Sequence, residues 1–92
     1  MPQVFKIAVY TVYFWVNETD PLEPVHVHVA KGVLSPNATK IWITKNGKCL
    51  LCHNNSKISE KQLRIFMQII EARNKTVLDL WYSTFKQISF YC

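Results

Sequence analysis

The sequence predicts an α+β domain: a small twisted antiparallel sheet of three to five strands, covered on one face by one or two C-terminal helices. Two patterns predict it. β-Branched and aromatic residues dominate the first half, and the hydrophobic period then changes from two to about three and a half. At 92 residues, with 49% hydrophobic and 18% charged residues, the chain has the size and composition of one globular domain, spanning 1–92.

We expect strands at roughly residues 4–16, 25–31, 38–45 and 48–52. The first stretch is long enough to fold back once. A turn at Ala8-Val9 would make it a hairpin, but neither residue favours turns, so one long bent strand is the alternative. Asn46-Gly47 is the preferred pair for a two-residue type I′ turn, in which both central residues have positive φ. That turn would place Cys49 opposite Thr44.

Helical periodicity covers roughly residues 59–87. Ser59 is a candidate N-cap, and Gln62 stands where a capping box needs it. Near Asn74 the pattern breaks or bends, and Thr76 with Asp79 could cap a second helix. The apolar end at 88–92 fits either a frayed helix or a short strand.

The stretch Val25-His26-Val27-His28-Val29 alternates two residue types within one strand. Successive side chains of a strand point to opposite faces, so the valines share one face and the histidines the other. We expect the valine face in the core together with Phe66, Ile70 and Trp81. The histidine face is expected to be left uncovered by the helices.

His26 and His28 are the candidate catalytic residues. Paired imidazoles could share acid–base work on a phosphodiester, with Lys31 or Lys45 stabilising the phosphate charge. The alternative is a pair that contributes only to the sheet surface, which is the commoner situation for an isolated H-x-H in a strand.

A metal site is the less favoured interpretation. The acidic loop before the histidines carries Glu18, Asp20 and Glu23, which could orient imidazoles or complete a site formed by His26, His28 and Glu23. Residues 49–53 read C-x-x-C-H, a haem-attachment pattern in exported proteins, and the two cysteines could join the histidines around zinc. A separation of three along a strand puts the cysteines on opposite faces. We therefore expect no cofactor, with zinc or another divalent metal as the alternative.

The formal charge of +5 permits an anionic partner such as RNA, DNA or an acidic protein. The basic residues are spread along the chain and form no run typical of nucleic-acid tails. The weak binding candidates are Glu18, Trp42 and Arg64. Trp42 could stack on a base, although core packing explains most aromatic residues here more simply.

The chain shows no signal-peptide pattern and no apolar run of membrane-spanning length. Its three cysteines are an odd number, typical of reduced thiols. We therefore expect a cytoplasmic protein without a membrane partner.

Several motifs together resemble one known family. They are Met1-Pro2-x-Val4-Phe5-x-Ile7, Asn17-Glu18, Glu23-Pro24-Val25-His26-Val27-His28-Val29, Ser59 through Leu63, and Asn74-x-x-x-Leu78-x-x-Trp81-x-x-x-Phe85. The chain resembles the domain of unknown function 4160 family along nearly its whole length. Relatives usually carry glycine where this chain has Ala8-Val9.

The resemblance implies a bacterial cytoplasmic protein encoded in a two-gene operon beside another small protein, a pairing suspected to be a toxin–antitoxin module. We therefore expect a toxin–antitoxin-type protein that acts through this cognate partner, with His26 and His28 on its functional face. The alternatives are a small nuclease or phosphodiesterase using both histidines, with or without a metal, and a nucleic-acid-binding regulator. An open sheet face or edge would also allow a homodimer.

Overall fold

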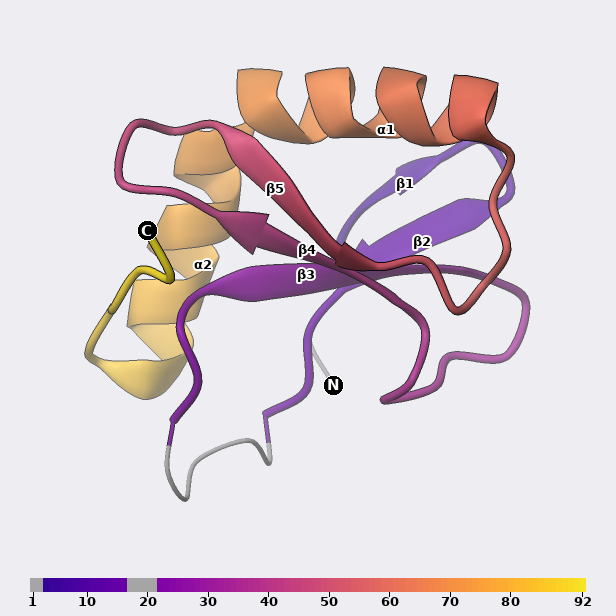
Figure 1. Cartoon of the computed structure of the whole chain (residues 1–92). Coiled ribbons are helices and arrows are strands. Elements are labelled where there is room, and N and C mark those ends of the chain that lie inside the picture. Colours follow the sequence, from indigo (N-terminus) through magenta and orange to yellow (C-terminus); the bar gives the residue numbers. More distant parts are fainter. Residues whose placement is uncertain (1–2, 17–21) are drawn as a thin grey trace.

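The computed structural model describes residues 3–16 and 22–92. Within these residues one five-stranded antiparallel sheet has the order β1-β2-β3-β4-β5, so each strand lies beside its neighbour in sequence. Two helices follow the sheet (Figure 1), which confirms the α+β fold class. The elements are β1 (Gln3–Ile7), β2 (Tyr10–Tyr13), β3 (His26–Lys31), β4 (Thr39–Ile43), β5 (Cys49–His53), α1 (Glu60–Ala72) and α2 (Asn74–Phe85).

The first strand region is a hairpin, not one long strand. Ile7 pairs with Tyr10, leaving Ala8 and Val9 as a two-residue turn. Ala8 has φ 54° and Val9 is not among the residues with positive φ, the sign pattern of a type II′ turn. Glycine normally occupies that first position, so the turn forms here at a cost in backbone strain.

The second hairpin lies where Asn46-Gly47 predicted it, but the expected type I′ turn is wrong. Gly47 N donates to Thr44 O and Thr44 N donates to Lys48 O, both at 3.0 Å, which makes a three-residue turn. Only Gly47 has a positive φ, 77°, whereas Asn46 does not. This is a type I turn closed by a left-handed glycine, and it places Cys49 opposite Ile43 instead of Thr44.

The helix signals are partly confirmed. Ser59 Oγ accepts a hydrogen bond from Gln62 N at 3.2 Å, as an N-cap does. The helical region is interrupted at Arg73, between the last residue of α1 and the first of α2. Thr76 does not cap α2, because that helix begins at Asn74 and Thr76 already lies in its first turn.

The main core lies between the sheet and the two helices, with α1 above the sheet and α2 at one end of it (Figure 1). It includes all six residues predicted for it: Val25, Val27, Val29, Phe66, Ile70 and Trp81. After α2 the chain is neither helix nor strand. It is fixed to the fold where Val25 N donates to Ser89 O at 2.9 Å and Lys45 N donates to Cys92 O at 3.0 Å. Of the described helices, none has the length and apolar character to cross a membrane.

Candidate functional site

His26 and His28 lie on the sheet face opposite the valines, as the alternation predicts. His26 pairs with Trp42 and His28 with Tyr13, whereas Val27 pairs with Ile41. The expectation that this face is uncovered is wrong. His26 is 0% exposed and His28 1% exposed, so the pair belongs to the interior.

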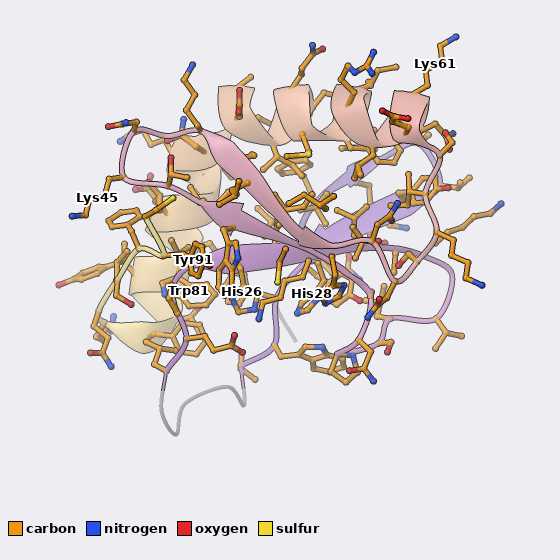
Figure 2. The ribbon with its side chains drawn as sticks, in the orientation of Figure 1. His26, His28, Lys45, Lys61, Trp81 and Tyr91 are labelled. Atoms are coloured by element: carbon orange, nitrogen blue, oxygen red, sulfur yellow. The ribbon has the colours of Figure 1, made fainter. Side chains whose placement is uncertain are left out.

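Aromatic rings from distant parts of the chain enclose the two imidazoles. The His26 ring packs edge-on against Trp81 of α2 at 5.3 Å between centroids, against Trp42 at 5.7 Å, and against His28 at 5.1 Å. The His28 ring stacks on Tyr13 at 5.5 Å. Figure 2 shows His26 between Trp81 and His28. The long indole of Trp81 thus reaches both the main core and the histidine pair.

The C-terminal segment adds a further layer over this cluster. Tyr91 stacks on Trp42, with ring centroids 4.7 Å apart and planes 3° from parallel, and Lys40 Nζ lies 4.5 Å from the centroid of the same indole. Farther along the face, Tyr13 forms a second small core with Ala30 and Ala38. Both faces of the sheet are therefore packed over β2, β3 and β4.

Backbone carbonyls fix the orientation of both histidine rings. His26 Nδ1 lies 2.9 Å from Pro24 O, and His28 Nδ1 lies 3.1 Å from Ala38 O. A carbonyl oxygen only accepts, so Nδ1 carries the proton and donates in both rings. An acid–base catalyst must come within hydrogen-bond distance of its substrate. In this conformation neither imidazole reaches the surface where a phosphodiester could approach.

Two hydrogen bonds also fix the side chain of Tyr13, on which His28 stacks. Its hydroxyl donates to Ser35 O at 2.6 Å and accepts from Ser35 N at 3.0 Å. Burial raises the pKa of Tyr13 above its usual value, although the hydrogen bond to the Ser35 carbonyl partly opposes this. Tyr13 is therefore a neutral hydrogen-bonding residue that joins β2 to the loop between β3 and β4.

The structure brings together only some of the candidate site residues. His26, His28 and Trp42 form one cluster, in which Trp42 is itself 9% exposed. The candidate cations lie apart: Lys31 is exposed at the end of β3, Arg64 is exposed on α1, and Lys45 points away from the histidines in Figure 2. Glu18 and Asp20 lie outside the described residues.

The candidate metal ligands are separated or otherwise engaged. Glu23 forms an ion pair with Lys40 Nζ. Cys49 lies beneath α1, away from the histidine face, with its Sγ 3.6 Å from Met67 O. Burial raises the pKa of Cys49 to about 12, and the charge of Glu71 adds to the effect, so this side chain is a thiol and not a thiolate. Among residues 3–16 and 22–92, no three His, Cys, Asp or Glu side chains gather as a metal site would require.

A second surface feature, which is not among the candidates predicted from the sequence, is the open edge of β5. Leu50 and Leu51 are 41% and 38% exposed on this last strand of the sheet. Hydrogen-bonded and non-bonded pairs alternate in an antiparallel ladder. Thr44 and Lys48 form a backbone hydrogen bond at the turn, so the next hydrogen-bonded pair along the ladder is Trp42 and Leu50. The N–H and C=O groups of Cys49 and Leu51 therefore point away from β4. The outward N–H of Cys49 donates to Glu71 Oε1 at 2.9 Å.

A hollow of about 340 Å³ runs along α1 beside this edge. Two of its lining residues, Met67 and Glu71, contact Cys49 at the start of β5. We call this surface, together with the open edge of β5, the β5–α1 groove. The residues that line it on α1 are Glu60, Leu63, Arg64, Met67, Gln68 and Glu71. The apolar run at 49–52 was the available sequence signal, but its exposure depends on which strand ends the sheet.

No curated protein and no solved structure matches this chain. One family model does match it, over residues 10–82, and its description is "Domain of unknown function (DUF4160)". The matched stretch runs from β2 through most of α2, including the histidine cluster and the β5–α1 groove. Because this covers most of the chain, the protein belongs to the DUF4160 family.

Proposed function

We propose that this protein acts by binding a partner protein, as one component of a small two-protein module of the toxin–antitoxin type in a bacterial cytoplasm. The observation that carries the proposal is the open edge of β5, where Leu50 and Leu51 are exposed beside the hollow along α1. Exposed apolar side chains on an unpaired strand are a protein-binding surface or an aggregation hazard. A partner that covers them explains why they are tolerated.

The burial of His26 and His28 supports binding over catalysis. With both rings enclosed and both Nδ1 atoms donating to backbone carbonyls, the histidines hold β3 against its surroundings and do not face a substrate. Their part in the proposed function is indirect: they position Trp42 and Trp81, and through these rings the sheet and α2.

The test is to produce the chain in a bacterial host, alone and together with the product of the neighbouring gene. We expect an equimolar complex by size-exclusion chromatography with light scattering. We also expect the growth of the host to differ between separate and joint expression. Failure of the two proteins to associate would contradict the proposal.

RNA integrity in the same cultures distinguishes the nuclease alternative. The control is the double variant His26→Asn/His28→Asn, because an asparagine amide can still donate to the carbonyls of Pro24 and Ala38 but cannot act as a base. Circular dichroism would verify that the variant is folded. We expect intact RNA with the wild-type chain; RNA loss that disappears in the folded variant would favour a histidine-dependent nuclease instead.

A further inference from the structure

We propose that the β5–α1 groove binds an extended segment of the partner protein as a sixth strand of the sheet, and that this segment is apolar at its centre and acidic at its ends. The inference rests on the proposed function, because it names the surface and the chemistry of partner binding.

The main chain of β5 has outward N–H and C=O groups, which an added strand could pair with in a regular ladder. The C=O of Cys49 and both the N–H and C=O of Leu51 point to the open side, by the alternation of the ladder with β4. The outward N–H of Cys49 is already bonded to Glu71. A β-bulge then shifts the register between Leu51 and His53. The edge therefore offers one short segment, centred on Leu51, for backbone pairing. Side-chain contacts must supply the rest of the binding energy of an added strand.

The side chains around this edge are suited to an alternating strand. Leu51 pairs with Ile41 on the helix-facing side of the sheet, and the apolar residues that line the hollow along α1 are Leu63 and Met67. Leu50 pairs with Trp42 and extends from the opposite face. An added strand would place alternate side chains in the hollow along α1, so these residues should be apolar.

Basic residues stand at both ends of β5. Lys45 and Lys48 lie at the turn before the strand, and Lys57 and Lys61 follow it; all four are exposed. Figure 2 shows Lys45 and Lys61 extending away from the fold in different directions. Of the acidic residues of the groove, Glu71 accepts a hydrogen bond from Cys49 N, and Glu60 is solvent-exposed and lies 3.9 Å from Arg64 on the same helix. Carboxylates at the ends of the added strand would complement the lysines.

The same charges disfavour a second copy of this chain as the occupant. Two β5 strands related by a two-fold axis run antiparallel, which brings the Lys48 end of one copy toward the Lys57 end of the other. Each copy also carries a formal net charge of +5. Like charges would meet at both ends, whereas an acid-flanked segment from another protein would be attracted.

Short peptides test the proposal directly with the wild-type chain. The first probe is a nine-residue peptide with two aspartates at each end and alternating valine and threonine between them. The second replaces the aspartates by lysines, and the third carries N-methyl groups on the amides that would face β5. We expect the acidic peptide to shift the NMR signals of β5 and α1, and to bind about tenfold more tightly than either control at low salt.

Two proline variants form a matched pair on the protein. Leu51→Pro removes an outward N–H without removing a hydrogen bond to β4. Lys6→Pro does the same on the other edge, because Lys6 and Thr11 are the non-bonded pair next to the β1–β2 turn. We expect Leu51→Pro to weaken binding of the acidic peptide about tenfold, and Lys6→Pro to leave it unchanged. If Leu51→Pro does not fold, the N-methylated peptide supplies the same test on the wild-type chain.

Equal binding of the acidic and lysine-flanked peptides, or full binding by folded Leu51→Pro, would overturn the proposal. If the wild-type chain self-associates, Leu51→Pro abolishes this self-association and no peptide binds, the occupant of the groove is a second copy of this chain and the proposal is wrong.

The complex with the neighbouring gene product distinguishes failure of this proposal from failure of the proposed function. If its complex survives Leu51→Pro, the function stands and the groove is excluded; if only the acidic peptide binds, the groove stands and the two-protein module is excluded.

Discussion

His28 is a polar residue placed in the interior for its hydrogen bond and its ring. Its Nδ1 donates to Ala38 O, and its face stacks on Tyr13, while 1% of the residue is exposed. A buried carbonyl that loses its donor costs about 1–3 kcal/mol. The hydrogen bond and the stacking together account for a histidine at this buried position.

We predict that His28→Leu lowers the free energy of unfolding by about 1–3 kcal/mol more than His28→Asn does, because asparagine can still donate to Ala38 O. Urea denaturation of both variants measures the difference. Equal losses would mean that the hydrogen bond to Ala38 contributes nothing to stability.

Cys49 differs from the other cysteines in its surroundings. Cys52 and Cys92 are exposed, whereas Cys49 is half-buried and the pKa of its thiol is raised to about 12, chiefly by burial. A thiol reacts as its thiolate. At pH 8 we therefore predict rapid alkylation of Cys52 and Cys92 by iodoacetamide and slow alkylation of Cys49, measured by mass spectrometry of the peptides.

The same shift gives a pH dependence with a definite sign. The pKa of Cys49 is higher in the folded chain than the ordinary thiol value of 9.0, so the unfolded chain loses this proton first as the pH rises. The contribution of Cys49 to stability is fully present below about pH 9 and is lost between pH 9 and pH 12. A Cys49→Ala variant should show a smaller loss over that window. An identical pH profile in both proteins would contradict the raised pKa.

At the scale of the elements, two glycines with the same positive φ should respond differently to substitution. Gly32 and Gly47 both have φ 77°. A Cβ on Gly32 would meet nothing within 4 Å, whereas one on Gly47 would lie 3.1 Å from Asn74 Nδ2. Asn74 is itself held by a hydrogen bond from Nδ2 to Glu71 O at 2.8 Å. The β4–β5 turn thus packs closely against the start of α2.

We predict that Gly32→Ala lowers stability by about 1 kcal/mol, the cost of a left-handed alanine, and that Gly47→Ala lowers it by more. Thermal unfolding of both variants tests this. The double variant Gly47→Ala/Asn74→Ala should recover the excess loss of Gly47→Ala, measured against Asn74→Ala. If Gly47→Ala costs no more than Gly32→Ala, the contact with Asn74 is unimportant.

The elements that local signals specify were predictable from the sequence. The predicted strand at residues 25–31 is found as β3 (His26–Lys31), where valine and histidine alternate, and Ser59 caps α1 by accepting a hydrogen bond from Gln62 N. The β1–β2 turn could not be decided, since alanine at φ 54° follows no local preference and is imposed by strand pairing. The type of the β4–β5 turn was predicted wrongly for a similar reason, because the register that pairs Ile43 with Cys49 requires three turn residues.

At the scale of the whole molecule, the candidate site was the least predictable part. Alternation gave the correct face for His26 and His28 but could not give their burial. Burial depends on Trp81 from α2 and on the C-terminal segment held by Ser89 and Cys92, both far away in sequence. We therefore propose the β5–α1 groove, and not the histidine face, as the functional surface.

The most direct test of this account is amide hydrogen exchange across the whole chain, alone and in complex with the product of the neighbouring gene. We predict that the outward N–H of Leu51 exchanges fast in the free protein and is strongly protected in the complex, while the exchange of the Lys6 amide on the opposite edge is unchanged. Protection confined to other surfaces, with Leu51 still exchanging fast, would contradict binding at β5.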